Sequence, residues 1–259
     1  MLEIKNLDFY YQTTKILNNI NFKAKKGEFI SMLGANGSGK TTFLQCIQGL
    51  LAPKAGKILI DGENIIQLSK KEIAQKISVV PQENKNVFAY EVLDMVVMGI
   101  NPWLSFAEDP SQADYQKAEK ILEHLGVAEL KRKNFNQISG GERQLVLIAR
   151  ALMQQTDILL LDEPNSHLDF KNVHLMMEIM RDLSFENKTV ITALHDPNLA
   201  YKYSDRVIIL KEGNILAAGA VEKVMTAANL SSAYDFNIQR VKPNFSLEFR
   251  AAQNFRKKA

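Results

Sequence analysis

The residues best suited to chemistry lie in the segment "GANGSGKTT", residues 34–42. Its glycines, lysine and threonine match the P-loop pattern G-x-x-x-x-G-K-[ST], in which backbone N–H groups surround phosphates, the lysine reaches their outer oxygens and the hydroxyl binds Mg²⁺. With glycine near 7% of residues, chance produces this pattern in about 1% of chains of this length. We therefore predict a nucleotide site formed by Asn36, Gly37, Ser38, Gly39, Lys40, Thr41 and Thr42.

Two carboxylates follow the apolar run "ILLL", residues 158–161. An aspartate at a buried strand end can hold Mg²⁺, and a neighbouring glutamate can act as the base that activates a hydrolytic water. We assign Asp162 the first role and Glu163 the second. A P-loop kinase would not need Glu163, because its nucleophile comes from the acceptor substrate. The pair therefore favours nucleotide hydrolysis.

Further candidate residues end or precede other apolar runs. His195 follows "TVITAL", and its neutral imidazole could hold the γ-phosphate or the attacking water. Gln82 follows "ISVVP" and could bind Mg²⁺ while moving with the helical segment after it. Tyr11 precedes Lys40 by 29 residues and offers a flat ring for a nucleobase, whereas its neighbours Phe9 and Tyr10 are expected to be ordinary strand residues.

A second anion site is predicted at "ISGGERQLVLIARAL", residues 138–152. Ser139 is placed to cap a helix, and the next two glycines allow close approach of a ligand to the first-turn N–H groups. One nucleotide has a single triphosphate, so the presence of two phosphate-binding segments in one chain requires an explanation.

These residues need a scaffold that brings them together. The apolar runs at 29–33, 77–81, 158–161 and 189–194 are typical of parallel strands buried on both faces. Ligands bind at the carboxyl ends of such strands, so the residues that follow them should meet in one crevice. Shorter alternating segments within 1–28 and 56–65 predict an antiparallel layer, and 205–219 a hairpin that turns at Glu212-Gly213-Asn214.

A helical subdomain is predicted between the P-loop half and the later strands. In "PSQADYQKAEKILEHLG", Ser111 caps a helix with the apolar stripe Ala118, Ile121, Leu122 and Leu125, and Gly126 ends it. We expect one α/β domain over 1–259, with a core of 1–83 and 157–240, a helical part of 84–156 and a basic tail of 241–259.

Composition narrows the class of protein. The 259 residues are 46% hydrophobic and 24% charged, which is ordinary for a globular chain, and a net charge of +3 spread along the chain gives no argument for nucleic acid. No segment resembles a secretory signal or a membrane span, so we expect neither export nor membrane spanning. The single cysteine, Cys46, has helical spacing with Phe43, Leu44, Ile47 and Leu50 and is expected in the core.

The order of these motifs resembles the ATP-binding cassette (ABC) ATPases over nearly the whole chain to about residue 240. The matching segments are Tyr11 as the adenine-stacking aromatic, "GANGSGKTT" as Walker A, Gln82 as the Q-loop, "ISGGERQ" as the signature, "ILLLDEP" as Walker B, "SHLD" (166–169) as the D-loop and His195 as the switch histidine. The resemblance implies a P-loop ATPase with ATP and Mg²⁺ as its cofactors, catalytic Glu163, His195 and Gln82, and metal-binding Thr41, Gln82 and Asp162.

The resemblance also explains the second phosphate site. In this family two cassettes meet head to tail, so Ser139, Gly140 and Gly141 would bind the γ-phosphate of the partner's ATP, and Asp169 of the D-loop joins the nucleotide-binding residues. The implied partners are a second copy of the chain, transmembrane permease subunits and, indirectly, a substrate-binding protein, with no nucleic acid. The implied location is peripheral, on the cytoplasmic face of the inner membrane.

Within the family, the chain looks most like ATPase subunits of bacterial importers for iron chelates, haem or cobalamin. Molybdate importers are similar, and a soluble cassette ATPase of iron–sulfur cluster assembly has comparable length. In "NVFAYEVLDMVVMGI" we expect Val92, Met95 and Val96 to pack inside the helical part. Val87, Phe88 and Tyr90 are the candidates for a groove that receives a short cytoplasmic helix of a permease.

Overall fold

The computed structural model describes residues 1–81, 89–165 and 168–238. These residues divide into two compact units. The first contains 1–81, 156–164 and 181–238, and the second contains 89–155 and the described part of 165–180. Residues 168–180 therefore lie in the second unit, whereas the sequence analysis placed them in the core.

A mostly parallel sheet forms the centre of the first unit. Its strand order in the described residues is β10-β9-β3-β8-β7-β6, and only the β9–β10 pair is antiparallel. The strands are β3 (Phe29–Leu33), β6 (Ile77–Val80), β7 (Ile158–Asp162), β8 (Thr189–Ala193), β9 (Arg206–Lys211) and β10 (Asn214–Ala220). Every residue of β3, β7 and β8 is buried, which confirms the prediction of strands covered on both faces.

An antiparallel sheet forms a second layer of the same unit, as predicted. Its strands, in the order β2-β1-β4-β5, are β1 (Leu2–Tyr11), β2 (Thr14–Ala24), β4 (Ala55–Ile60) and β5 (Glu63–Asn64). Buried and exposed residues alternate along much of β2, because one face packs on the core and the other meets solvent. The predicted 205–219 hairpin is also confirmed, with β9 and β10 joined at Glu212 and Gly213.

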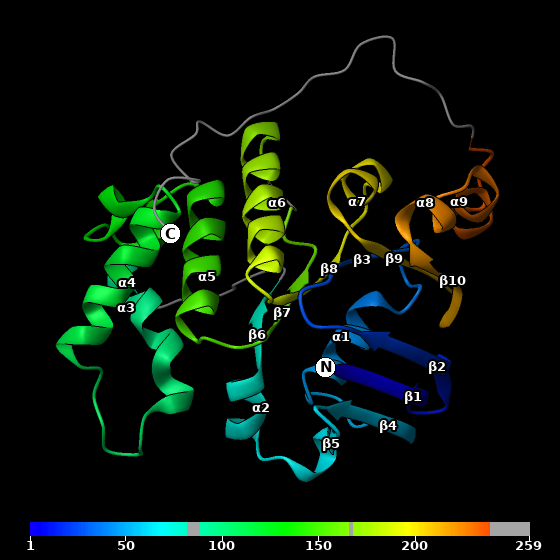
Figure 1. Cartoon of the computed structure of the whole chain (residues 1–259), viewed down its shortest axis with the longest axis horizontal. Helices are drawn as coiled ribbons and strands as arrows, with labels where there is room; N and C mark the ends of the chain where they lie inside the picture. The colour runs from blue at the N-terminus through cyan, green and yellow to red at the C-terminus, as the bar shows by residue number, and fades with distance from the viewer. Residues whose placement is uncertain (82–88, 166–167, 239–259) are drawn as a thin grey trace. The chain divides into compact units, whose positions relative to one another are not determined.

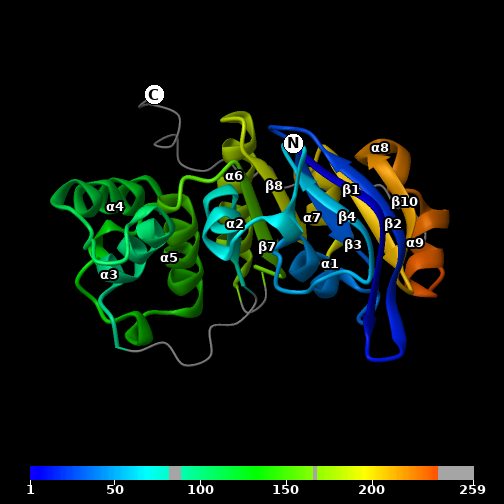
Figure 2. The same cartoon turned by 90° about the horizontal axis from the view of Figure 1, so that it is seen from below.

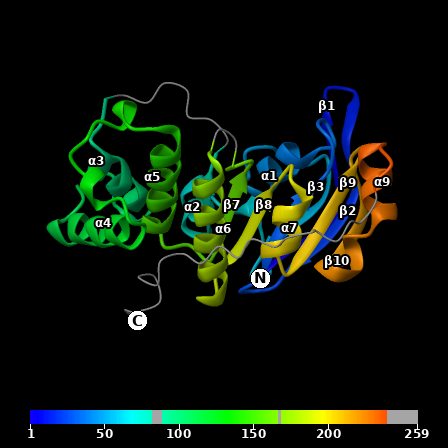
Figure 3. The same ribbon diagram turned by 90° about the horizontal axis from the view of Figure 1, so that it is seen from above.

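Helices cover both faces of the core sheet in the first unit. They are α1 (Lys40–Ile47), α2 (Lys70–Lys76), α7 (Pro197–Tyr203), α8 (Val221–Val224) and α9 (Ala227–Tyr234). Figure 1 shows α1 between the two sheets, where the Phe43 ring meets the Phe22 ring edge-on at 6.4 Å between centroids. Seen from above in Figure 3, α7 covers the opposite face of the core sheet, against β3.

The apolar stripe predicted around Cys46 is correct except at its last member. Phe43, Leu44, Cys46 and Ile47 are fully buried, but Leu50 is 66% exposed, so its assignment to this stripe was wrong. The reason is that α1 ends at Ile47 and Gly49 adopts a positive φ of 68°, which turns Leu50 out of the helical register. Burial raises the pKa of the Cys46 thiol to about 12, which agrees with a core role.

The second unit is built mainly from helices. They are α3 (Val92–Val97), α4 (Gln112–His124), α5 (Gly140–Met153) and α6 (Phe170–Phe185), whose last residues belong to the first unit. Short 3-10 segments lie at Ile65–Gln67 in the first unit and at Met98–Trp103, Ala128–Leu130 and Phe135–Gln137 in the second. Helices α3, α4 and α5 pack on one another (Figure 2), and Val92, Met95 and Val96 are buried there, as predicted.

The helix ends in the second unit follow the sequence signals. Ser111 caps α4 in a reciprocal capping box with Asp114, and Gly126 adopts the positive φ of 69° that ends the helix. Ser139 caps α5 in the same way with Glu142. In the described parts of the chain no helix has the length and hydropathy needed to cross a membrane.

Candidate functional site

The P-loop joins β3 to α1 and places Lys40 at the first position of the helix. The Lys40 side chain is buried, and its Nζ donates to the Gly34 carbonyl at 2.8 Å and to the Ala35 carbonyl at 3.3 Å. Burial lowers the pKa of the Lys40 ammonium, and the charges of Glu163 and Asp162 oppose that effect. The α1 N-cap, Gly39, makes no side-chain cap, so the first-turn N–H groups remain available to a phosphate.

An oxygen-donor pair lies beside the lysine. Thr41 Oγ1 donates to Asp162 Oδ1 at 3.3 Å, which joins the first turn of α1 to the end of β7. Burial raises the pKa of the Asp162 carboxyl, while the Thr41 hydrogen bond partly offsets this. A hydroxyl and a carboxylate are the hard oxygen ligands that Mg²⁺ prefers, and a divalent cation would compensate the buried carboxylate charge. These two side chains therefore fit a magnesium site.

A carboxylate–imidazole pair stands at the ends of two adjacent strands. Glu163 directly follows β7 and His195 lies shortly after β8, and these strands pair in parallel with Asp162 opposite Ala193. His195 Nε2 lies 2.7 Å from Glu163 Oε1. Glu163 has a positive φ of 48°, a backbone conformation that costs a non-glycine residue free energy and is concentrated at functional sites. The pair can orient a water molecule and transfer its proton.

One pocket in the first unit collects most of these residues. Its volume is about 480 Å³, and it is lined by Tyr11, Ile16, Asn36, Gly37, Gly39, Lys40, Thr41, Thr42, Glu163 and His195. The predicted convergence of the P-loop with the ends of β7 and β8 is confirmed by this lining. Ser38 and Asp162 are buried and do not line the pocket. Asp162 is connected to the pocket through its hydrogen bond with Thr41.

The aromatic and apolar wall of the pocket comes from the β1–β2 hairpin. Tyr11 is 47% exposed and lines the pocket, whereas Phe9 is buried and meets the Tyr11 ring edge-on at 4.9 Å. Tyr10 points to another surface, where Lys54 Nζ lies 4.5 Å from its ring centroid. Sequence reasoning missed Ile16, because no motif contains it. Only the hairpin pairing of Tyr11 with Thr14 could have indicated it.

The segment predicted to form a second phosphate site belongs to the second unit. The Ser139 backbone N–H donates to Glu142 Oε2 at 2.7 Å, and the Glu142 backbone N–H donates to Ser139 Oγ at 3.3 Å. Ser139 and Gly140 are exposed, so the start of α5 is open to a ligand. Gly141 is buried against Asn172, whose side-chain nitrogen would lie 2.5 Å from any Cβ added there. A side chain at this position would therefore displace Asn172.

Asp169, which the resemblance assigns to a D-loop, stands at the start of α6. Asp169 Oδ1 accepts a hydrogen bond from the Asn172 backbone N–H at 2.8 Å, which is the geometry of an N-cap. Asp169 and the signature serine thus both occupy helix N-termini in the second unit. Gln82, Val87 and Phe88 lie outside the residues that the structure describes, so their roles stay predictions from the sequence.

Comparison with known proteins places this geometry in a family. The model for the ABC transporter family matches residues 17–166. An uncharacterized ABC transporter ATP-binding protein of Methanocaldococcus jannaschii is 42% identical over 235 residues, covering 90% of this chain and 91% of the relative. A probable iron chelatin transport ATP-binding protein of Helicobacter pylori is 38% identical over 93% of this chain and 95% of its own. A molybdate import ATP-binding protein of Haemophilus influenzae is 35% identical, covering 90% and 87%.

Solved structures give the same result for the fold. An inward-facing transporter described as of metal-chelate type matches with a TM-score of 0.80 and 35% identity, over 90% of this chain and 88% of that chain. A dimeric ATP-binding cassette in a post-hydrolysis state with ADP and Pi matches with a TM-score of 0.77 and 29% identity, over 85% and 99%. Both likenesses include the P-loop unit and the helical unit, since each covers most of the chain.

Proposed function

Because the chain belongs to the ABC transporter family and is one of its ATPases, we propose that it powers a bacterial importer for an iron chelate, haem, cobalamin or a similar metal complex. ATP hydrolysis is supported by one observation: Lys40 and Thr41 line the same pocket as Glu163 and His195. Similarity to the iron chelatin relative and to the metal-chelate transporter supports the choice of cargo.

The site residues divide the work of hydrolysis. Lys40 and the loop amides bind the β- and γ-phosphates of ATP. Thr41 and Asp162 would hold Mg²⁺, which would supply positive charge for the phosphate oxygens of the leaving group. Glu163 accepts the proton of the attacking water, and His195, 2.7 Å away, holds that carboxylate and senses the γ-phosphate. Tyr11 stacks on the adenine. Gln82 is proposed to link Mg²⁺ with the helical part.

Hydrolysis is proposed to require two copies of the chain. Each ATP would lie between the P-loop of one copy and the exposed start of α5 in the other. There the Ser139 hydroxyl, whose oxygen already accepts from Glu142, can still donate its proton to a phosphate. The dimeric ADP-bound cassette supports this arrangement.

A mixing experiment tests the shared sites. Lys40→Ala chains are combined with Ser139→Arg chains, and the heterodimer is isolated through two different tags. A shared arrangement gives one intact site and one doubly damaged site, so ATP binding at one site per heterodimer should return. Binding that stays absent in the verified heterodimer would contradict sharing, and each variant alone serves as the control.

Coupling to transport is proposed to occur through the segment that precedes α3, on the cytoplasmic face of the membrane. The Tyr90 side chain is 39% exposed. The Tyr90 backbone is held in place because its carbonyl accepts the Phe135 N–H at 2.9 Å. Tyr90→Ser combined with Phe88→Ser should release the chain from membranes that contain its permease. Tyr115→Ser is the matched control, because Tyr115 is a tyrosine of similar exposure, 36%, in the same unit.

Cargo is tested by reconstituting the chain with its permease and binding protein in proteoliposomes. ATP hydrolysis and uptake are measured with a ferric siderophore, haem, cobalamin and molybdate in parallel. Stimulation by one of the first three is expected. Stimulation by molybdate alone would favour the alternative suggested by the molybdate relative, and a chain that never associates with membranes would instead support a soluble cassette ATPase.

A further inference from the structure

The turn between β9 and β10 lies directly behind the P-loop. The Gly213 backbone N–H donates to the Ser38 carbonyl at 3.1 Å, and the Gly213 carbonyl accepts the Asn18 N–H of β2 at 2.8 Å. One residue of the turn thus connects the phosphate loop to the antiparallel sheet. Gly213 does not line the nucleotide pocket, so these bonds support the loop from outside it.

The bond to Ser38 determines the direction of a neighbouring amide. In a trans peptide the carbonyl of one residue and the N–H of the next point in opposite directions. Because the Ser38 carbonyl is directed at Gly213, the Gly39 N–H is directed away from the turn. Gly39 itself lines the pocket. The turn therefore fixes the orientation of the amide of a residue that lines the pocket.

Close backbone packing makes this support stiff. A Cβ on Gly213 would lie 2.2 Å from the Ile16 carbonyl oxygen, and one on Gly39 would lie 3.3 Å from the same oxygen and 2.9 Å from Leu17 Cδ2. The turn and the loop thus both pack against the same peptide of β2. Ile16 also lines the pocket. A displacement of the turn would be transmitted to the loop, since no space separates them.

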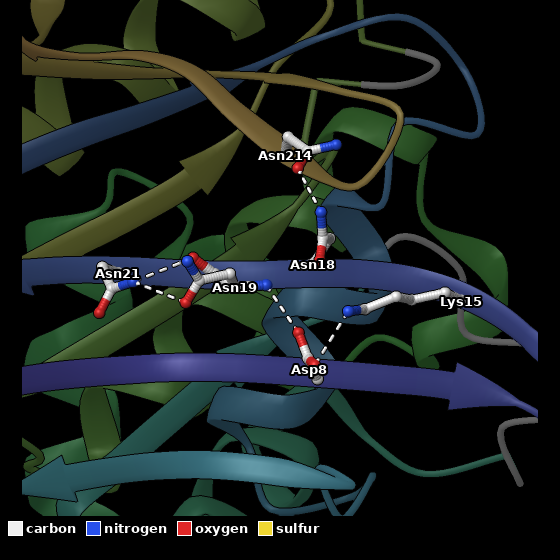
Figure 4. Close-up of polar contacts among 6 residues, drawn as sticks. All are labelled: Asp8, Lys15, Asn18, Asn19, Asn21 and Asn214. Carbon is white, nitrogen blue, oxygen red and sulfur yellow. Dashed lines mark hydrogen bonds and ion pairs between the residues drawn. The ribbon is translucent and has the colours of Figure 1, made fainter.

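Asparagine side chains hold the turn on β2, as Figure 4 shows. Asn18 Nδ2 donates to Asn214 Oδ1 at 2.8 Å. Asn214 Nδ2 in turn donates to the Glu212 carbonyl at 2.9 Å. Asp8 on β1 secures the same part of β2 from the other side. Its carboxylate accepts hydrogen bonds from the Asn19 N–H at 2.7 Å and from Lys15 Nζ at 2.9 Å. These two residues directly flank the segment 16–18 that contacts the turn.

We propose that Gly213, with the Asn18–Asn214 pair, is a positioning site for the P-loop that sets its affinity for the phosphates of ATP. Loosening the turn lets the Ser38–Gly39 peptide rotate, so part of the loop population no longer presents its amide to the nucleotide. The loss is expected in binding, because the hydrogen bonds of Gly213 go to Ser38 of the P-loop and to Asn18 of β2, whereas Glu163 and His195 follow β7 and β8. The proposal requires only ATP binding and is independent of the cargo and the dimer.

Gly213→Ala is the first test, with Gly62→Ala as its matched control. Both glycines sit in turns of the same unit with positive φ, 75° and 87°, but a Cβ on Gly62 meets no atom within 4 Å. Both variants should lose thermal stability from backbone strain, and Gly213→Ala should lose more, because its Cβ also meets the Ile16 carbonyl oxygen at 2.2 Å. Only Gly213→Ala should weaken ATP and ADP binding, by about tenfold, with KM rising more than kcat falls. Equal nucleotide affinities for the two folded variants would overturn the proposal.

The Asn214 pair keeps the proposal testable if Gly213→Ala does not fold. Asn214→Ala removes the acceptor of the Asn18 side chain and should weaken nucleotide binding by about twofold to tenfold, the range of one lost hydrogen bond. Asn18→Ala removes the donor of the same bond and should weaken nucleotide binding by a similar factor. Unchanged affinity in both variants would contradict the role of the pair, as would a kcat decrease at constant KM.

Discussion

The comparison of Ser139→Ala with Ser111→Ala separates helix capping from nucleotide binding. Both serines form capping boxes, and their oxygens accept the N–H three residues later at 3.3 Å in each case. The reciprocal bonds from the serine N–H to the acidic side chain measure 2.7 Å at Ser139 and 2.8 Å at Ser111. The Ser111 hydroxyl also donates to Asp114 Oδ2 at 2.7 Å. Each substitution should cost about 1 kcal/mol of stability, Ser111→Ala at least as much as Ser139→Ala, which lowers the Tm of a chain of this size by about 2–4 °C.

The two variants should differ in ATP-driven dimerisation. A hydrogen bond to a charged phosphate contributes about 1.5–3 kcal/mol, and a symmetric dimer contains it twice. Ser139→Ala should then lose roughly 3–6 kcal/mol of dimerisation free energy, a decrease of about two to four powers of ten in the association constant. Ser111→Ala should dimerise like the wild type.

Sedimentation of each variant with a non-hydrolysable ATP analogue measures the dimer constant, and thermal unfolding without nucleotide measures the capping cost. The reasoning is refuted if Ser139→Ala dimerises as tightly as Ser111→Ala while both show a Tm decrease in the capping range. Ser139 would then be a helix cap and no more. A loss of dimerisation in both variants would show that the effect comes from helical stability.

Three further outcomes are expected. Glu163→Gln should retain ATP binding and slow hydrolysis by ~10²–10⁴-fold in a phosphate-release assay, and turnover near wild type would remove Glu163 from its role as the base. Cys46, buried and with its pKa raised by burial to about 12, should resist thiol alkylation at pH 8 in the native state and react fully in denaturant, so fast native labelling would contradict its core position. Phe43→Ala should cost about 3–5 kcal/mol in urea unfolding, whereas Leu50→Ala, at an exposed position, should stay within about 0.5 kcal/mol.

Local signals in the sequence were sufficient to predict most of the helices and strands and the residues that line the pocket from the P-loop. The P-loop, the capping boxes at Ser111 and Ser139 and the hairpin turn at Gly213 each depend on residues a few positions apart, because the hydrogen bonds involved close within one turn of the chain. Continuous apolar runs predicted the buried strands for the same reason, since burial on both faces leaves no position for a polar side chain.

The tertiary structure decided which distant residues meet. The sequence predicted that Glu163 and His195 share a crevice but not that they pair at 2.7 Å. It contained no signal for Ile16 in the pocket wall or for Asn172 beside Gly141. Each of these contacts depends on strand order, hairpin register or helix packing, which are set by the whole core. The support of Ser38 by Gly213 has the same origin. In the sequence, Gly213 and Gly62 are both ordinary turn glycines. Only the packing of β2 against the Gly213 turn distinguishes Gly213 from Gly62.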